Sequence, residues 1–366
     1  MPLTDEFANS AIALKLAEHI KTLSRPDHPV RLMEFCGSHT TAILRYGIRQ
    51  LLPPDIELLS GPGCPVCVTA QTDIDRALNL ARVPSVILTT FGDMLKVPGS
   101  QGSLAEARAA GADVRIVYST LDALELARDN PSRQVVFLGI GFETTAPTIA
   151  ASIAQAAEYG ISNYSVYSLA KICPPVIKAL LNSGEIRLNG LICPGHVSAV
   201  IGTEPYEFIA RDHAVACVIA GFEPVDILQA IAMLLTQLLE GHPRVEVAYT
   251  RGVGLSGNPT ALKLMHKVFE PAAVSWRGMG DVPGSGLKLR PEYAAYDAEK
   301  RFDIAPVPEY KTIGCICGEI LRGVKTPADC TLFGLACTPT RPIGPCMVSS
   351  EGACAACHSY GDGRGG

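Results

Sequence analysis

The chain is poor in charge and has no excess of basic residues. Only 18% of its 366 residues are charged, and 31 Lys and Arg against 36 Asp and Glu give a formal net charge of −5. A protein that binds nucleic acid needs positive charge to neutralise the phosphates of its partner. The composition therefore predicts no nucleic-acid partner.

The sequence also lacks a long apolar run and the layout of a secretion signal. Its first residues, MPLTDEFANS, do not place a basic segment before an apolar one. No apolar stretch approaches the ~20 residues that a membrane-spanning helix needs. A P-loop and a convincing GxGxxG nucleotide fingerprint are missing as well. We expect a protein of the cytoplasm with no membrane association.

What the sequence does contain is cysteine, with 13 residues in a chain that is 48% hydrophobic. Structural disulfides are rare in reducing cytoplasm, so clustered cysteines there indicate metal binding or redox chemistry. Three cysteines are instead isolated in apolar runs such as AVACVIA, where a thiol packs as a small apolar side chain. We assign these three, Cys173, Cys193 and Cys217, to the core.

Short β-rich runs alternate with segments of helical periodicity between residues 31 and 270, a pattern typical of α/β domains with mainly parallel sheets. The expected strands are RLMEF (31–35), IELLS (56–60), SVILTT (85–90), VRIVY (114–118), QVVFLGI (134–140), YSVYSL (164–169), LNGLIC (188–193), AVACVIA (214–220) and VEVAY (245–249). The clearest helix is 226–240, for which Asp226 is the expected N-terminal cap.

Nine strands exceed one compact sheet, so we expect two parallel-sheet α/β domains. Residues 1–130 form the first domain and 131–270 the second, with the boundary near RDNPSR (128–133). Beyond residue 270 the periodicity fades, and Pro, Gly and Cys dominate. We expect residues 271–366 to form a third, C-terminal domain that is poor in regular structure and folds around a metal group.

Three loops of similar sequence, at 91–95, 141–145 and 221–225, each follow an expected strand. Ligands of open α/β sheets bind at the carboxyl ends of the strands, where such loops lie. Glu143 lies in the second of these loops and is a candidate binding residue. His196 occupies another strand-to-helix turn, where a hydrogen-bonded structural histidine is the more common case.

Seven cysteines crowd the C-terminal segment: Cys315, Cys317, Cys330, Cys337, Cys346, Cys354 and Cys357. Thiolates select zinc or iron–sulfur clusters, and either would stabilise a segment rich in Gly and Pro. A zinc knot usually has two CxxC pairs, whereas only Cys354 and Cys357 are spaced in this way. Irregular spacing favours a 4Fe-4S cluster, in which each iron needs one thiolate.

Cys36 and His39 lie in the loop MEFCGSHT, directly after an expected strand. A nearby imidazole can lower the pKa of a thiol or share a metal with it. A buried cysteine beside a hydrogen-bonded loop histidine fits this short pattern equally well.

Cys64 and Cys67 form the second N-terminal motif, GPGCPVC, between an expected strand and a helix that starts near Thr72. A helix N-terminus stabilises a thiolate, and Pro65 stiffens the pair. The motif favours a reversible disulfide over half of a zinc site, because no second cysteine pair lies nearby in the sequence.

The motifs FCGSHT, GPGCPVC, GFETTAP, CPGH and the tail CGEILRG, ADC, CTP and PCMVSSEGAC resemble the HypD family of nickel–iron hydrogenase maturation proteins nearly from end to end. The resemblance implies two α/β domains and a C-terminal iron–sulfur domain. It also implies a complex with the small chaperone HypC and with HypE, which donates cyanide. Such a complex assembles the Fe(CN)2CO unit that later enters the hydrogenase large subunit.

The resemblance also implies roles for individual residues. Cys36, with His39 beside it, would hold the iron of Fe(CN)2CO, and Cys64 and Cys67 would form the redox-active pair. Glu351 lies in a stretch associated with function. The implied cluster ligands are Cys317, Cys330, Cys337 and Cys354, with Cys346 and Cys315 as alternates. The extra Cys357 and His358 depart from the family pattern, so the fourth ligand stays open.

These parts suggest that electrons pass from the C-terminal cluster to the Cys64–Cys67 pair, close to iron bound at Cys36. The alternative is a stand-alone iron–sulfur disulfide oxidoreductase, which needs the same cysteines but carries no iron cargo. A structural scaffold around a zinc knot is a third possibility.

Overall fold

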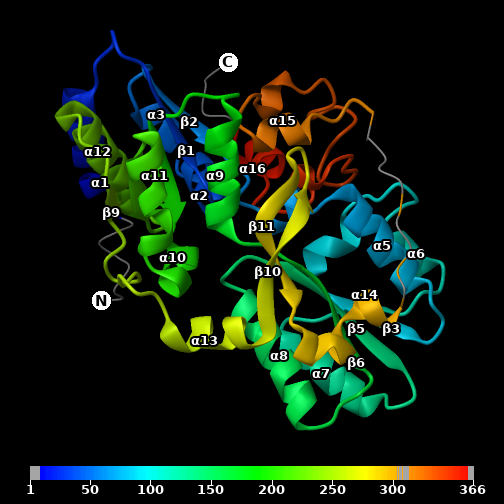
Figure 1. The fold of residues 1–366 in the computed structure, drawn as a ribbon. Helices are drawn as coiled ribbons and strands as arrows, with labels where there is room; N and C mark the ends of the chain where they lie inside the picture. The colour runs from blue at the N-terminus through cyan, green and yellow to red at the C-terminus, as the bar shows by residue number, and fades with distance from the viewer. Residues whose placement is uncertain (1–8, 303, 305–306, 308–312, 362–366) are drawn as a thin grey trace.

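The computed structural model describes residues 9–302, 304, 307 and 313–361, and it contains two parallel β-sheets (Figure 1). The first sheet has the order β2-β1-β7-β8-β9, with strands β1 (Val30–Glu34), β2 (Ile56–Ser60), β7 (Gly190–Pro194), β8 (Ala216–Ala220) and β9 (Val245–Val247). The second has the order β4-β3-β5-β6, with β3 (Val86–Thr90), β4 (Val114–Ile116), β5 (Gln134–Gly141) and β6 (Tyr164–Ala170). The predicted α/β class is confirmed, and all nine strands overlap their predicted runs.

The two sheets do not divide the chain at residue 130. The four strands of the second sheet lie in sequence between β2 and β7, so the first sheet takes strands from both sides of them. The predicted boundary falls between β4 and β5, which belong to the same sheet. The first sheet is completed by β1, whose Leu32 lies opposite Gly190 of β7. Pairing between strands so distant in the chain has no local sequence signal.

Helices cover both sheets. The helices before residue 160 are α1 (Ser10–Leu23), α2 (Gly37–Arg45), α3 (Ile48–Leu51), α4 (Pro65–Val68), α5 (Gln71–Ala81), α6 (Leu104–Ala109), α7 (Thr120–Asp129) and α8 (Ala146–Glu158). The following ones are α9 (Cys173–Ser183), α10 (Gly195–Ile201), α11 (Glu207–His213), α12 (Pro224–Glu240), α13 (Pro259–Val268) and α14 (Ala298–Arg301). Helices α1 and α12 pack together on the first sheet, and α7 and α8 cover the second.

Helix α12 begins earlier than predicted, and its cap is a different residue. Glu223 is the N-cap, and its side chain accepts a hydrogen bond from the backbone of Asp226, which lies in the first turn. Asp226 returns a hydrogen bond to the Glu223 backbone at 3.2 Å. It also forms a bidentate ion pair with Arg251, with both contacts at 2.6 Å. The carboxylate therefore closes a capping box and fixes the chain after β9.

A β-hairpin occupies the region where the sequence shows no periodicity. Strands β10 (Phe269–Trp276) and β11 (Gly280–Leu289) are antiparallel, and their ladder is irregular between Ala272 and Val274. Figure 1 shows the hairpin running from the second sheet towards the C-terminal region. Trp276 is 1% exposed and donates a hydrogen bond to Ser285 at 2.7 Å. This region of the predicted C-terminal domain thus contains regular structure.

The remaining described segment, residues 313–361, is called the cysteine tail below. Its regular elements are short: α15 (Cys317–Leu321) and α16 (Ala353–Tyr360), with 3-10 turns at Pro327–Asp329 and Pro345–Met347. Three further 3-10 turns elsewhere lie at Gly92–Lys96, Glu204–Tyr206 and Pro291–Tyr296. The tail is poor in regular structure, as predicted. Of the helices in the described residues, none has the length and apolarity needed to cross a membrane.

Candidate metal and redox site

The carboxyl ends of four strands of the first sheet bring several predicted site residues together. Cys36 follows β1, Cys64 follows β2, His196 follows β7 and Phe222 follows β8. Because these strands are parallel neighbours, the loops at their carboxyl ends meet at one edge of the sheet. This edge, with Cys36, Cys64, His196 and Phe222, is called the head site below.

Cys36 is the N-cap of α2, and its own backbone N–H donates to the Glu34 carboxylate at 2.8 Å. Burial raises the pKa of the Cys36 thiol to about 12, and the nearby carboxylates of Glu351 and Glu34 add to the rise. Backbone N–H groups of Ser38 and His39 act in the opposite direction. The free thiol is therefore protonated at neutral pH, and a metal that binds it must displace the proton.

His39 carries no positive charge that could act on the Cys36 thiol. Its ring is fully buried, its Nε2 lies 2.8 Å from the Gly221 carbonyl, and it stacks on Phe222 with centroids 4.6 Å apart. His196 stacks on the same phenylalanine at 3.9 Å. Burial lowers the pKa of His39 to about 4, so its imidazole is neutral at physiological pH. The expected lowering of the Cys36 pKa by an imidazolium is therefore absent, while Nδ1 of His39 has no partner among the described residues.

Glu34 is a site residue that the sequence analysis missed. Its carboxyl is buried and accepts hydrogen bonds from the Cys36 backbone and from the hydroxyl of Thr40. Burial raises its pKa to about 7, so it can hold a proton beside the Cys36 loop. An acidic residue at the end of an otherwise apolar strand, two positions before a candidate cysteine, was the available signal.

Cys64 and Cys67 form a disulfide with their Cα atoms 5.2 Å apart. Cys64 is the N-cap of the short helix α4, which precedes α5, and its sulfur accepts from the backbone N–H of Cys67 at 3.3 Å. Both residues are buried, at 3% and 0% exposure. The predicted helix near Thr72 begins at Gln71, so the pair caps an additional turn that the sequence analysis did not predict.

The Cys36 loop and the disulfide loop are in direct backbone contact. The N–H of Gly37 donates to the carbonyl of Gly63 at 3.2 Å. A Cβ atom at Gly63 would overlap the backbone of Cys36, so only glycine allows this close approach. The motif GPGC thus places the disulfide beside Cys36 through its second glycine.

The cysteine tail also reaches the head site. Ser38 donates to the Glu351 carboxylate at 2.6 Å, and Thr41 donates to the carbonyl of Ser350 at 3.1 Å. The sulfur of Cys67 lies 4.0 Å from the carbonyl oxygen of Pro345. Three segments that are far apart in the sequence therefore meet: the Cys36 loop, the disulfide and the tail.

Five cysteines of the tail surround one small cavity with otherwise apolar walls. The four predicted ligands Cys317, Cys330, Cys337 and Cys354 line it together with Cys315. The pKa of Cys317 lies well below that of a free thiol, because the thiols of Cys315, Cys346 and Cys354 donate hydrogen bonds to its sulfur. Cys346 is fully buried and Cys357 is buried near α2, away from this cavity. The structure thus groups the predicted ligands with both alternates.

The chain matches the HypD family model, described as "Hydrogenase formation hypA family", over residues 11–361. HypD2 of Bradyrhizobium diazoefficiens, a hydrogenase maturation factor, is 50% identical over 369 residues, covering 99% of this chain and 97% of the relative. The hydrogenase maturation factor HypD of Rhizobium leguminosarum bv. viciae is 49% identical, with 99% and 96% covered. That of Escherichia coli K12 is 44% identical, with 98% of both covered.

The chain belongs to the HypD family. The family match spans both sheets, the hairpin and the cysteine tail, so the resemblance noted in the motifs extends over the whole described structure.

The thiols of the tail in this HypD-family chain match the donor set of an iron–sulfur cluster. Within the described ranges, no three His, Cys, Asp or Glu side chains are already arranged around one point to hold an ion. A 4Fe-4S cluster instead spreads its four thiolates over four irons. Six clustered sulfurs, an apolar surround and a Gly- and Pro-rich backbone match that donor set.

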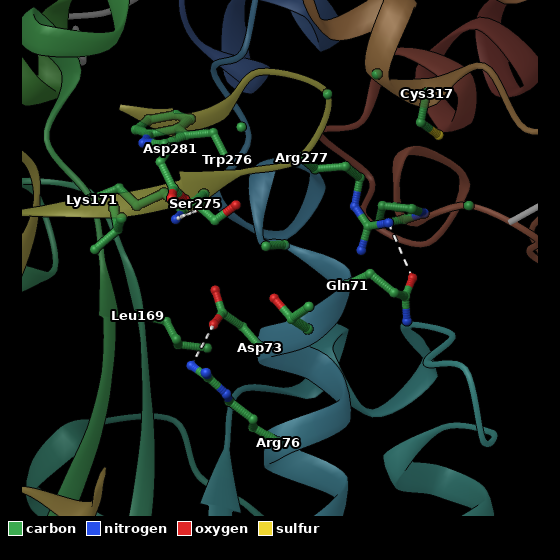
Figure 2. Close-up of a pocket in the computed structure, with 18 of the residues that line it drawn as sticks. Gln71, Asp73, Arg76, Leu169, Lys171, Ser275, Trp276, Arg277, Asp281 and Cys317 are labelled. Atoms are coloured by element: carbon green, nitrogen blue, oxygen red, sulfur yellow. Dashed lines mark hydrogen bonds and ion pairs between the residues drawn. The ribbon is translucent and has the colours of Figure 1, made fainter. Parts of the chain in front are cut away.

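A larger cavity of about 1040 Å³ lies beside the tail of this chain (Figure 2). Its wall includes Asp73 and Arg76 of α5, Lys171 after β6, Arg277 of the hairpin and Cys317 of the tail. Lys171 is 2% exposed and donates to the carbonyl of Ser275 at 2.7 Å. These charged groups could not be predicted as a set, because they come from separate elements and only the fold brings them together.

The remaining candidates occupy the interior. Glu143 is buried and accepts from the backbone of Cys173 at 2.8 Å, and burial raises its pKa to about 7. Cys173, Cys193 and Cys217 are buried as predicted, with the sulfurs of the last two 3.5 Å apart. Glu143 therefore holds the first residue of α9 through a hydrogen bond.

Proposed function

We propose that this chain is a cytoplasmic hydrogenase maturation factor that assembles the Fe(CN)2CO unit of a nickel–iron hydrogenase. Its partners in this role are a HypC-type small chaperone and a HypE-type cyanide donor, with the hydrogenase large subunit as the later recipient. The names of the relatives support the maturation role. The observation that carries the proposal is the meeting of Cys36, the disulfide and the tail at one edge of the first sheet.

The iron of Fe(CN)2CO is cargo, and Cys36 is its proposed anchor. A low-spin iron that carries cyanide prefers a soft thiolate ligand. The Cys36 thiol must lose its proton when iron binds. Glu34, a buried carboxyl that accepts from the Cys36 backbone, has a pKa of about 7 that suits it to receive that proton. Glu351 and Ser38 close the loop from the tail side. The neutral His39 packs behind the loop.

The tail is the proposed binding site of a 4Fe-4S cluster, held by Cys317, Cys330, Cys337 and Cys354. Such a cluster supplies electrons one at a time when bound. Cys315 and Cys346 are alternates, since both hydrogen-bond to Cys317. Cys357 is less suited, because it lies against α2 rather than in the cavity of the other thiols.

The Cys64–Cys67 disulfide is the proposed two-electron store of the head site. Breaking its S–S bond takes up two electrons and two protons and leaves two thiols, and re-forming the bond releases them. A low-potential one-electron carrier is the reductant class that must supply these electrons. The contact of Cys67 with Pro345, next to Cys346, gives the disulfide a short path to the tail.

Substitution of the disulfide tests this role. In Cys64→Ser, iron and acid-labile sulfide content should equal those of the wild type, because Cys64 lies outside the tail cavity. The cyanide and carbonyl infrared bands of the protein co-purified with its HypC-type partner should be lost. Persistence of those bands at wild-type intensity would eliminate the disulfide from assembly.

The second candidate function is a stand-alone iron–sulfur disulfide oxidoreductase. The large cavity whose wall includes Cys317 favours it, since such a cavity offers room for a small substrate. Purified protein without partners should then reduce a small disulfide catalytically when given a low-potential electron donor. A protein that shows no turnover, yet binds a HypC-type partner and carries iron beyond the cluster, supports the assembly role instead.

A further inference from the structure

Arg277 lies at the tip of the β10–β11 hairpin and is held there by three hydrogen bonds. Its backbone N–H donates to the carbonyl of Val68 at 2.9 Å, directly after the disulfide turn. Its Nε donates to the carbonyl of Thr69 at 3.0 Å, and its Nη1 donates to the side-chain oxygen of Gln71 at 3.2 Å. Figure 2 shows the guanidinium between Gln71 and Cys317.

The hairpin tip is also fixed against the tail. Gly278 packs backbone to backbone on Gly318, and a Cβ at either position would overlap the other residue. Arg322 donates to the carbonyls of both Gly278 and Gly318. Arg277 directly precedes Gly278, and Cys317 directly precedes Gly318. The contact between the two glycines therefore brings Arg277 close to Cys317. This contact holds the hairpin backbone against the tail, and the hydrogen bonds to Thr69 and Gln71 hold the guanidinium.

The charge of Arg277 has no carboxylate partner among the described residues. All three of its hydrogen bonds go to neutral oxygens, and its Nη2 is buried without any partner. Arg277 is half-buried, and a partly desolvated charge without an anionic partner is costly. Burial lowers the pKa of Arg277, and the thiols of Cys317, Cys346 and Cys315 oppose that lowering, ahead of Asp73.

Two other arginines around the large cavity lie near carboxylates. Arg322 forms an ion pair with Glu185 at 2.6 Å, and Arg76 lies 3.7 Å from Glu299. Lys171 lies on the far side of the cavity from Cys317 in Figure 2, over the Trp276 ring and against a backbone carbonyl. Among the described residues of this cavity wall, Arg277 thus combines a position beside the tail cysteines with the lack of a carboxylate partner.

We propose that Arg277 is a positioning residue whose fixed positive charge raises the reduction potential of a cluster held by the tail cysteines. The inference rests on the proposed cluster and deepens that part of the function. Four thiolates give a bound cluster a net negative charge, which grows by one when it accepts an electron. A cation fixed in a partly buried site beside the thiolates favours the more negative, reduced form. The charge that the hairpin carries therefore favours reduction of a cluster bound at the tail.

The test is the midpoint potential of the cluster in the full-length protein, measured by equilibrium titration and read by electron paramagnetic resonance. In Arg277→Gln, the ratio of reduced to oxidised cluster at a fixed potential should fall about tenfold, which is a midpoint lower by about 59 mV for one electron. Arg277→Lys keeps the charge and should stay closer to the wild type. Arg322→Gln is the matched control: the same change at an arginine that contacts Gly278 but is paired with Glu185.

A second variant leaves Arg277 in place. Gln71→Glu keeps an acceptor for the guanidinium and puts a negative charge beside it, so it should lower the reduced fraction in the same direction as Arg277→Gln. If Arg277→Gln fails to fold or to bind iron and sulfide, the midpoint potential of Gln71→Glu is the test of the role of Arg277.

A wild-type midpoint in Gln71→Glu, or an equal shift in Arg322→Gln, would overturn the role of Arg277 while leaving the cluster intact. Absence of iron and sulfide from the wild type itself would instead refute the proposed cluster, and with it this inference. The two failures are thus distinguishable by iron and sulfide analysis before any titration.

Discussion

The head site and the cysteine tail both present thiols, but they are held in different ways. Cys36 and the disulfide follow strands of a parallel sheet, and the loops that carry them are fixed by backbone contacts and apolar packing. The tail has only short helices and turns, and its thiols are partners for one another. We therefore expect the head site to keep its shape without metal, and the tail to depend on the cluster proposed to bind its thiols.

This difference suits the two proposed tasks. A site that receives and releases iron cargo needs ligands that stay in place when the iron is absent. A site that keeps its cluster permanently can use that cluster as part of its fold. The two sites meet at Glu351 and Pro345, so the tail helps to close the head site.

The largest expected effect comes from removing a tail ligand. Cys317→Ala should lose most of its iron and sulfide, because Cys317 hydrogen-bonds to three other thiols at the centre of the group. Without the bound group, residues 313–361 should be cleaved about tenfold faster by a protease, since open forms become more populated. Iron and sulfide analysis and timed proteolysis measure both effects.

Cys217→Ala is the control for this experiment. It removes a buried thiol from the first sheet and should lower the free energy of unfolding by about 1–2 kcal/mol, while iron and sulfide stay at wild-type levels. Equal loss of iron from both variants would mean that the tail is no more dependent on its thiols than the sheet is.

The next effect concerns the framework of the head site. Asp226→Asn removes the buried charge that pairs with Arg251 and weakens the capping box of α12. We expect a loss of about 3 kcal/mol in the free energy of unfolding, measured by chemical denaturation, with unchanged iron and sulfide. Loss of iron in this variant would show that the two regions are not independent.

A smaller effect depends on pH. Unfolded His39 binds a proton near its ordinary pKa of 6.5, whereas the folded protein resists protonation until about pH 4. Stability is therefore lost as pH falls from 6.5 towards 4. Relative to His39→Gln, which keeps a donor for the Gly221 carbonyl, the wild type should lose about 1 kcal/mol between pH 7 and 5.5. An equal change in the free energy of unfolding of both proteins between pH 7 and 5.5 would contradict the buried, neutral state of His39.

The smallest expected effect is on the Cys36 thiol in metal-free protein. After burial, the Glu351 carboxylate is the largest contribution that raises its pKa. Glu351→Gln should lower that pKa and increase the rate of Cys36 alkylation about threefold at pH 8. Mass spectrometry of the modified peptide measures the rate. An unchanged rate would mean that the tail does not influence the head site electrostatically.

Local sequence patterns predicted all nine strands of the parallel sheets and the loops that follow them. The β-branched runs mark each strand, and parallel strands place their following loops at one edge, so the neighbourhood of Cys36 and Cys64 could be expected. Their division between two sheets could not, because the pairing of β1 with β7 depends on long-range contacts.

The hairpin and the tail were harder for physical reasons. Strand β11 contains Gly280, Gly284 and Gly286, which interrupt the alternation that marks a strand. Its tip residue Arg277 acquires its surroundings only when the hairpin meets α15. In the tail, spacing identified a thiol cluster, but the closeness of Cys315 and Cys346 to Cys317 depends on turns that spacing does not specify.

The central claim is that Cys36 anchors the iron cargo while the tail cysteines hold a separate cluster. Infrared spectroscopy of Cys36→Ala, co-purified with a HypC-type partner, tests it most directly, with iron and sulfide measured on the same sample. We predict no cyanide or carbonyl bands and wild-type sulfide content. Cyanide and carbonyl bands at wild-type intensity in Cys36→Ala would contradict the claim and place the iron elsewhere.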